Sequence, residues 1–168
     1  MRKIFSSITS RRLPVLFVAL FAAFVLYGCG SDEGKDAGDD VKVEDSGDPA
    51  KDSFKRGVQH SLKGNHDKAI EAYNESLKHN PHSAVVHSNL GFEFYDKELF
   101  DKSVESQEKA LDMDPELANA YYGLAMALEK KGDNDGAAEN YREFMKISKP
   151  HSLWWNNAKA TVERLESK

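Results

Sequence analysis

Cysteine is the scarcest residue of this 168-residue chain, which has only Cys29. A single cysteine excludes an intrachain disulfide and a metal site built from four cysteines of one chain. Basic residues are also in deficit, because 23 Lys and Arg face 28 acids and the formal net charge is −5. Binding of nucleic acid depends on cations that neutralise phosphates, so we expect no nucleic-acid partner. With 40% apolar and 30% charged residues, the composition also argues against collagen, full disorder and several membrane spans.

Acids are absent from the first 28 residues, which carry Arg2, Lys3, Arg11 and Arg12. An apolar run follows from Leu13 to Tyr27. As a helix these residues reach roughly 22 Å at about 1.5 Å per residue, which is less than the hydrocarbon core of about 30 Å. Residues 1–28 are therefore predicted to be a secretory signal peptide rather than a permanent span.

The end of this segment, Leu26-Tyr27-Gly28-Cys29, resembles the bacterial lipobox. Leu26, Gly28 and Cys29 match that pattern, and Tyr27 departs from the smaller residue that is usual there. The resemblance implies acylation of Cys29 with palmitate-type chains, cleavage before it, and a lipid bilayer as one partner. Gly30 stands where an Asp would signal retention in the inner membrane, so the resemblance favours the outer membrane, facing the periplasm. The alternatives are an ordinary signal with a coincidental cysteine and an uncleaved anchor.

Residues 29–52 lack aromatic side chains and are rich in acids. Between Gly30 and Asp52 lie nine acids and three lysines, and Val41 and Val43 are the only large apolar residues. Such a segment buries too little apolar surface to offset the entropy of ordering, and like charges extend it. We predict a flexible acidic tether. A calcium site is disfavoured, because the acids do not have the spacing of a helix-flanked calcium loop.

The rest of the chain repeats itself every 34 residues. Pro81 and Pro115 are 34 residues apart, and so are Gly57 and Gly91, with the small residue Ala125 one step further. Three frames result: 50–83, 84–117 and 118–151. Each contains two segments of 12 to 14 residues with helical periodicity. Turns are predicted at residues 64–65, around 97–98 and at 132–133.

These frames resemble the tetratricopeptide repeat family. The matching residues are Gly57, Ala69, Tyr73 and Pro81 in the first frame; Leu90, Gly91, Phe94, Ala110 and Pro115 in the second; and Tyr121, Leu124, Ala125, Ala137 and Tyr141 in the third. Ser103 and Gln107 take the places of a small and an aromatic residue. The resemblance implies an all-α fold, in which three helix-turn-helix repeats stack as a right-handed superhelical α-solenoid.

Residues 152–167 are predicted to form one further amphipathic helix that caps the stack. Ser152 is suited to its N-terminus, and Trp155, Ala158 and Val162 occupy the packing positions of a fourth repeat. No second helix follows, so this helix is expected to cover the exposed apolar face of the third repeat. Both tryptophans are interpreted mainly as packing residues.

By the same resemblance, the concave face of the stack is lined by outward positions of the first helices. The predicted partner-binding groove consists of Phe54, Val58, Val85, Ser88, Phe92, Tyr95, Asn119, Tyr122, Met126 and Glu129. Aromatic residues and a methionine that packing does not require indicate a site for an apolar or helical segment of a protein partner. The alternative is that neighbouring repeats or the N-terminal region cover these residues.

One member of the family binds peptide C-termini through a clamp of lysines or arginines with asparagines. In this chain the clamp positions hold Phe54, Val58, Asn89, Asn119 and Gly123. Only Asn89 agrees, so recognition of that type is disfavoured.

Catalysis and cofactor binding have little support in the sequence. No glycine-rich phosphate loop, nucleophile elbow or zinc-protease motif occurs. Acids are expected on exposed helical faces, as with Glu105 and Lys109. A metal-binding or enzymatic role for His79, His82 and His87 is the remaining alternative, although these residues fall around an exposed loop.

The sequence therefore predicts a lipoprotein that displays three repeats from a membrane and acts as a scaffold or assembly factor in the bacterial envelope. We expect no catalytic residue, no cofactor and no metal. A pilotin-like role in pilus or secretion-system assembly is a narrower alternative that rests on analogy. A self-associating module, and hence a homo-oligomer, is another.

Overall fold

The computed structural model describes residues 46–167 of the chain. The predictions for the signal peptide, for Cys29 and for most of the tether lie outside the described residues. Within the described part, no helix has the length and apolar character needed to cross a membrane.

Residues 46–167 form seven α-helices and no strand, as the helical periodicity predicts. In chain order these are α2 (Pro49–Leu62), α3 (His66–His79), α4 (Ala84–Asp96), α5 (Phe100–Met113), α6 (Ala118–Lys131), α7 (Asn134–Ile147) and α8 (Leu153–Glu166). The first six pack as consecutive pairs, so each of the three frames folds as one helix-turn-helix unit.

The first described helix begins earlier than the predicted end of the tether. Pro49 occupies the first turn of α2, where its missing N–H costs no hydrogen bond. The Asp48 carboxylate accepts from the backbone N–H groups of Ala50 and Lys51 at 3.0 and 3.3 Å. Asp52 lies within the helix and accepts from Ser46. Residues 49–52 therefore belong to α2 and not to the predicted tether, because a proline and a capping acid start the helix there.

The three turns within the repeats lie where they were predicted. Gly64 and Gly132 adopt φ angles of 69° and 86°, a left-handed conformation that glycine adopts without steric cost. Glu98 occupies the corresponding turn of the second repeat with φ of 59°. Each turn reverses the chain, so the two helices of a repeat run antiparallel.

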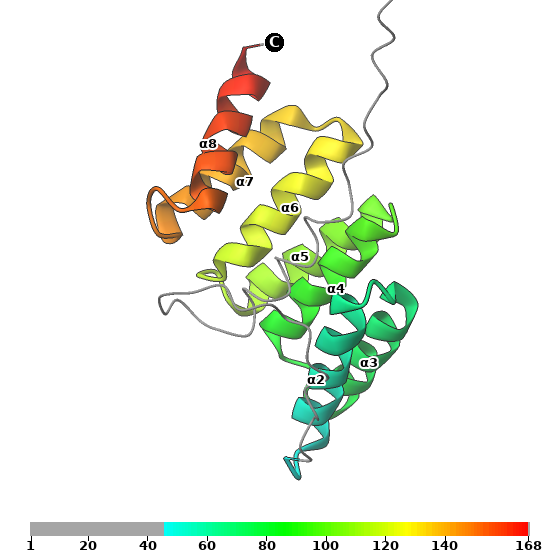
Figure 1. The fold of residues 1–168 in the computed structure, drawn as a ribbon. Coiled ribbons are helices and arrows are strands. Elements are labelled where there is room, and N and C mark those ends of the chain that lie inside the picture. Colours follow the sequence, from blue (N-terminus) through cyan, green and yellow to red (C-terminus); the bar gives the residue numbers. More distant parts are fainter. Residues whose placement is uncertain (1–45, 168) are drawn as a thin grey trace, which may run out of the picture.

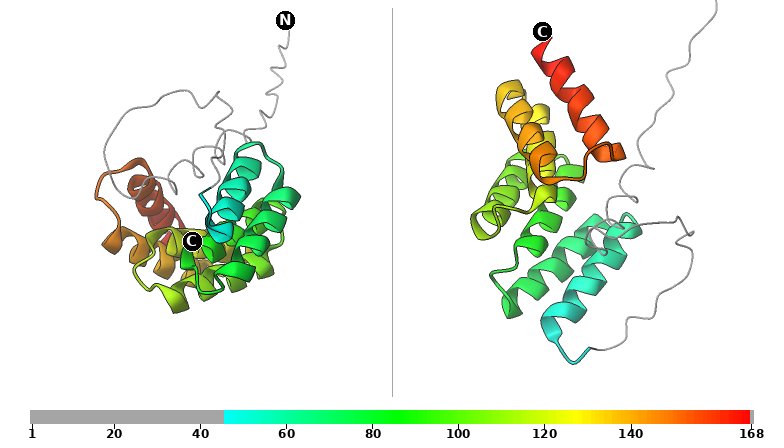
Figure 2. Two further views of the ribbon diagram at one scale, coloured as in Figure 1. Left: turned by 90° about the horizontal axis from the view of Figure 1, so that it is seen from below. Right: turned by 90° about the vertical axis from the view of Figure 1, so that its left-hand side faces the viewer.

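The helix pairs stack side by side into a curved solenoid (Figure 1). The first helices of the second and third repeats, α4 and α6, contact each other directly. Seen from below, the helices trace an arc that runs from α2 in cyan to α8 in red (Figure 2). This arrangement confirms the predicted all-α superhelix and brings α2, α4 and α6 into one layer.

Apolar packing is concentrated at the two ends of the solenoid. The first cluster joins α2, α3 and α4, and its buried members are Val58, Ala69, Tyr73, Val86 and Leu90. The second joins α6, α7 and α8, and its buried members are Tyr122, Ala125, Tyr141, Phe144, Ala158 and Val162. A smaller cluster extends the second through Ala137, Ala138 and Leu165. Among the described residues, α5 contributes no side chain to these clusters.

Glycines allow the close helix crossings that the repeat spacing predicts. A Cβ atom at Gly57 would lie 2.4 Å from the ring of Tyr73, and one at Gly91 would lie 2.4 Å from the side-chain amide of Gln107. Real Cβ atoms do not approach other atoms this closely. The glycines are thus required by packing between the two helices of one repeat.

Helix α8 packs on α7 through Ala158, Val162 and Leu165, which are buried. Ser152 accepts from the backbone N–H of Trp155 at 3.2 Å and caps the helix. Trp154 makes an edge-to-face contact with Tyr122, with ring centroids 5.5 Å apart. The predicted capping helix is therefore present, and both tryptophans are partly buried in its packing.

Candidate functional site

The predicted groove residues divide into a partly exposed set and a buried set. The partly exposed set comprises Phe54, Val85, Phe92, Tyr95, Asn119, Met126 and Glu129. These residues come from α2, α4 and α6, the three first helices of the repeats. We call them the candidate groove, and their role in partner binding stays a prediction.

Val58, Ser88 and Tyr122 are buried, so the prediction that they line an open groove is wrong. Val58 belongs to the apolar cluster of the first repeat. The Ser88 carbonyl oxygen accepts a hydrogen bond from the Gln107 side chain at 3.0 Å. Tyr122 is enclosed by aromatic rings of α7 and α8, with Phe144 at a centroid distance of 4.9 Å. In each case a neighbouring helix covers a position that repeat numbering alone treats as outward.

The centre of the candidate groove is the face shared by α4 and α6. The Phe92 ring lies against Gly123 of α6, because a Cβ atom there would be 3.0 Å from it. Tyr95 packs edge-to-face on Phe100 with ring centroids 5.6 Å apart. Met126 lies at the edge of the second apolar cluster. An aromatic and thioether surface that its own fold leaves partly exposed is suited to an apolar segment of another protein.

The candidate groove ends at an acidic side chain that α8 holds in place. Glu129 accepts from the Arg164 guanidinium at 2.6 Å. Burial, with the negative charges of Glu129 and Asp96 nearby, raises the pKa of Tyr95 to about 12. Burial likewise raises the pKa of Tyr122 to about 12, with contributions from Tyr95 and Glu129. Both phenols therefore stay neutral at physiological pH and act as packing and hydrogen-bonding groups.

A buried polar cluster that sequence reasoning missed lies between the first and second repeats. The Glu93 side chain is almost fully buried, and its carboxylate lies 2.8 Å from His66 Nδ1. The Asp96 carboxylate lies 4.0 Å from the same nitrogen. Lys97 and Asp67 form an ion pair beside them. The expectation that the acids occupy exposed faces holds for Glu105 and Lys109 at 2.7 Å but is wrong for Glu93.

Burial in this cluster disfavours the charged form of Asp96. Burial raises the pKa of Asp96 to about 6; His66 opposes the shift and Glu93 adds to it. Burial and the charge of Glu93 also raise the pKa of Tyr73. Carboxyl groups with raised pKa occur at catalytic sites, but also within structural networks. His66 of the first repeat and Glu93 of the second meet in this cluster, so the cluster fits a structural joint between the repeats.

A second buried polar group fills the interface between α4, α5 and α6. Gln107 is fully buried, and a Cβ atom at either Gly91 or Gly123 would collide with its side chain. Ser103 Oγ donates to the Gly91 carbonyl oxygen at 2.7 Å. The Gln107 side-chain oxygen and Ser88 Oγ have no hydrogen-bond partner. The middle repeat is therefore held by small and polar residues rather than by an apolar core.

The three histidines of the metal hypothesis do not converge on a common centre. His79 Nε2 lies 3.6 Å from Glu75, His87 Nε2 lies 3.2 Å from the Pro81 carbonyl oxygen, and His82 is exposed. Among residues 46–167, no group of three or more His, Cys, Asp or Glu is arranged to hold a metal ion.

The one clamp position that agrees with peptide-carboxylate binding, Asn89, is not accessible. Asn89 is buried, so its amide is not presented to a bound peptide. Gly123 is buried against Gln107 and Phe92.

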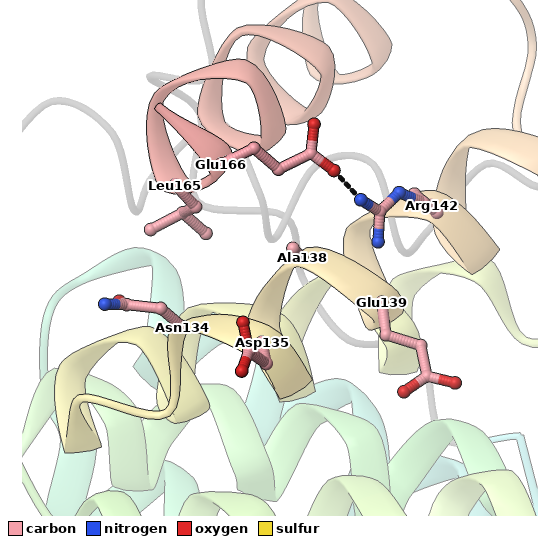
Figure 3. A pocket seen from close by; sticks show the side chains of 7 residues that line it. All are labelled: Asn134, Asp135, Ala138, Glu139, Arg142, Leu165 and Glu166. Carbon is pink, nitrogen blue, oxygen red and sulfur yellow. Dashed lines mark ion pairs between the residues drawn. The ribbon is translucent and has the colours of Figure 1, made fainter. Parts of the chain in front are cut away.

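A surface pocket lies between α7 and α8. Ala138 and Leu165 supply its apolar part, and the remaining lining residues are Asn134, Asp135, Glu139, Arg142 and Glu166 (Figure 3). The ion pair of Arg142 with Glu166 crosses from one helix to the other. The pocket is separate from the candidate groove, and the ion pair across it helps to hold α8 against α7.

A stack of helix pairs whose inner layer is only partly covered defines a helical-repeat domain of the kind that binds other proteins. Sequence models described as "Tetratricopeptide repeat" match residues 50–83 and 88–149. The chain therefore belongs to the tetratricopeptide repeat family.

Relatives by sequence are much longer proteins. The chain is 27% identical over 97 residues to protein bimA of Emericella nidulans, covering 58% of this chain and 12% of that protein. It is 31% identical over 111 residues to the protein O-mannosyl-transferase TMTC1 of Mus musculus, covering 64% of this chain and 12% of that protein. The matches thus concern the repeats and span a small part of each relative.

Solved structures match the fold over most of the described chain. The Arabidopsis OM64 TPR domain is 22% identical with a TM-score of 0.66, covering 70% of this chain and 94% of that one. The TPR2B domain of yeast Sti1 in complex with pHsp70 is 19% identical with a TM-score of 0.66, covering 71% and 97%. A T3SS complex from Aeromonas hydrophila is 18% identical with a TM-score of 0.68, covering 73% and 83%. At these identities the likeness concerns the fold alone.

Proposed function

We propose that the chain is a membrane-anchored scaffold of the bacterial envelope whose candidate groove binds an apolar segment of another envelope protein. The observation that carries this proposal is the partly exposed face of Phe92, Tyr95 and Met126 on adjacent first helices. Because α4 and α6 contact each other and the Phe92 ring lies against Gly123 of α6, these side chains come from two adjacent helices. Relatives with this fold act mainly as interaction scaffolds, which favours binding over catalysis.

The membrane part of the proposal rests on the sequence before residue 46. Cys29 follows a basic and apolar signal-like segment, and acyl chains there would contribute about 0.8 kcal/mol for each buried methylene. A tether would then hold the repeats near the membrane and raise their effective concentration toward partners on the same surface. Replacing Cys29 with Ala should release the protein into the salt-extractable fraction. Continued membrane retention after carbonate extraction would refute the lipid anchor.

The partner segment is proposed to be apolar rather than an acidic C-terminus. One similar structure is the first TPR of Spaghetti (RPAP3) bound to the HSP90 peptide SRMEEVD. This chain has no Lys or Arg at the clamp positions set out above, and Asn89 is buried. Without cations to pair with its carboxylates, such a peptide would lose its main electrostatic attraction. Fluorescence anisotropy with labelled SRMEEVD should show no saturable binding.

The groove is tested by photo-crosslinking in intact membranes. A photoreactive amino acid at Asn119, within the groove, should trap a defined envelope protein, whereas the same probe at Val104 on α5 should not. The variant Phe92→Ala/Tyr95→Ala/Met126→Ala should reduce the Asn119 product at least about tenfold, as expected when central anchors of an interface are removed.

The matched control replaces the half-buried aliphatic residues Val104 and Leu111 of α5 with Ala and should leave the product unchanged. Circular dichroism would establish that both variants fold. An undiminished product in the folded groove variant would show that another face binds the partner.

A further inference from the structure

The most exposed aliphatic side chains of the described residues flank a single turn. Leu153, the first residue of α8, is 62% exposed, and Ile147, the last residue of α7, is 42% exposed. The other exposed large hydrophobic residues, Val85, Leu99 and Met113, are 38–39% exposed. Residues 148–152 connect α7 to α8, so Ile147 and Leu153 lie at the same end of this helix pair. Isolated exposed aliphatic residues are ordinary, but two at one turn need a further reason.

The Trp155 side chain packs against this turn. Trp155 donates from its indole nitrogen to the Met145 carbonyl oxygen at 3.1 Å. Its ring contacts His151 at a centroid distance of 5.3 Å, and Lys159 Nζ lies 5.9 Å from its centroid. We call Ile147, Lys149, Leu153, Trp155 and Lys159 the C-terminal corner. Both tryptophans of the chain, at positions 154 and 155, lie in or beside it.

The charge of this region is opposite in sign to that of the whole chain. Residues 144–162 contain no acid and carry Lys146, Lys149 and Lys159, although the chain has a net charge of −5. Lys146 pairs with Glu143 at 2.5 Å and Lys159 Nζ lies 3.9 Å from the Glu163 carboxylate, and both acids stand directly outside this stretch. The corresponding turn between the second and third repeats contains Asp112, Asp114 and Glu116 instead. Cations around exposed aliphatic and aromatic side chains therefore distinguish the corner from its structural counterpart.

We propose that the C-terminal corner rests on the surface of a bilayer that contains anionic phospholipids. Tryptophan favours the headgroup level, aliphatic side chains enter the boundary with the acyl chains, and lysines pair with lipid phosphates. Two exposed aliphatic side chains beside a tryptophan and lysines have the composition of a surface that rests on an anionic bilayer, so we assign the corner to a bilayer rather than to a protein partner. The proposal depends on the membrane location proposed above, but not on the groove.

The order of the helices relates the start of α8 to the start of α2. Consecutive helices alternate in direction, and α2, α6 and α8 all begin at their lower ends in Figure 1. An anchor at the N-terminus and a contact at the C-terminus would fix the orientation of the repeats and keep the candidate groove beside the membrane.

The two tryptophans provide a direct readout. The full chain is reconstituted in vesicles of phosphatidylcholine, alone or mixed with phosphatidylglycerol, and brominated lipids are used to quench tryptophan. We expect quenching with phosphatidylglycerol to exceed that with phosphatidylcholine alone by at least about threefold. The variant Ile147→Asp/Leu153→Asp should reduce it to the phosphatidylcholine level, and so should Lys149→Glu/Lys159→Glu.

The matched control is Leu99→Asp/Met113→Asp, which changes two exposed aliphatic residues elsewhere. Met113 ends α5 as Ile147 ends α7. Near-ultraviolet circular dichroism confirms that the aromatic packing of each variant is intact. Quenching should be unchanged in this control and in the groove variant, so loss of groove binding and loss of the corner contact are separate results. Vesicle flotation measures attachment of the chain through the proposed lipid anchor, independently of tryptophan quenching.

Equal quenching in the two lipid mixtures, or equal quenching of the parent chain and the corner variants, would overturn the proposal. A protein that crosslinks to the corner in the absence of lipid, with no quenching by brominated lipid, would assign the corner to a protein partner instead.

Discussion

Replacing Asp96 with asparagine tests whether the buried carboxyl at the end of α4 destabilises the fold at neutral pH. Only 14% of this side chain is exposed. Burial raises the pKa of Asp96 from 3.8 to about 6, with His66 opposing the shift and Glu93 adding to it. The folded state therefore holds this proton more tightly than the unfolded state does.

The sign and size of the effect follow from that difference. Because the folded-state pKa is the higher one, the charged carboxyl disfavours folding above about pH 6, and this penalty disappears as the pH falls toward 4. The interval from 3.8 to about 6, at about 1.4 kcal/mol per pH unit, corresponds to roughly 3 kcal/mol. Asparagine resembles the protonated carboxyl in shape and carries no charge. At about pH 8, Asp96→Asn should therefore raise the free energy of unfolding by up to about 3 kcal/mol.

Urea denaturation of the parent chain and the variant at several pH values measures this difference. The other charges that face Asp96, namely Glu93, His66 and the Asp67–Lys97 pair, are present in both proteins, so most of their own pH dependence cancels. As a control, Asp112→Asn changes an exposed acid near the end of α5. It should change the free energy of unfolding by no more than about 0.5 kcal/mol at any pH.

Two results would contradict this reasoning. A stability difference between the parent chain and Asp96→Asn that does not vary with pH would show that the carboxyl is not desolvated by folding. A variant that is less stable at about pH 8 would show that the attraction between Asp96 and His66 outweighs the cost of burial.

Three further substitutions test the packing. Gly57→Ala should lower the free energy of unfolding by about 2–3 kcal/mol in urea titrations, because its Cβ atom would lie 2.4 Å from the buried ring of Tyr73; an unchanged midpoint would show that the helices separate at little cost. Ser152→Ala removes the oxygen that accepts from the N–H of Trp155 and should cost about 1 kcal/mol, whereas Ser152→Asp should retain the cap. Gln107→Met removes a buried oxygen that has no partner and should raise the thermal midpoint and slow hydrogen exchange in α5; faster exchange would show that its bond to α4 is worth more than its burial costs.

The helices and their turns were predictable because proline and small residues recur at the same positions of successive repeats. Proline at positions 81 and 115 and small residues at 57, 91 and 125 mark the same points of successive frames. A helix crossing that needs glycine or alanine restricts the sequence whatever the surrounding side chains are. The helix pairs and their turns therefore followed from spacing, whereas their stacking into a solenoid followed from the resemblance to the repeat family.

The groove was less predictable because exposure depends on side chains from other helices. Repeat position marks Tyr122 as outward, yet rings of α7 and α8, including Phe144 and Trp154, enclose it. Glu93 shows the reverse error. It follows Val86 and Leu90 by helical steps, so helical periodicity places it on the buried face, although acids in general were expected on exposed faces. The compensating His66 comes from another repeat, and no spacing within α4 reveals it.

The division of the solenoid into two apolar ends and a polar middle has a consequence for binding. In a stack of repeats each unit contacts only its neighbours, so the middle repeat couples the ends. Here that coupling runs through Gln107 and two glycines rather than through an apolar core. Phe92 lies on the N-terminal side of this interface and Met126 on the C-terminal side. A partner segment that contacts both side chains would bridge the two ends and stabilise the fold by mass action, and we expect that stabilisation to be concentrated in α5.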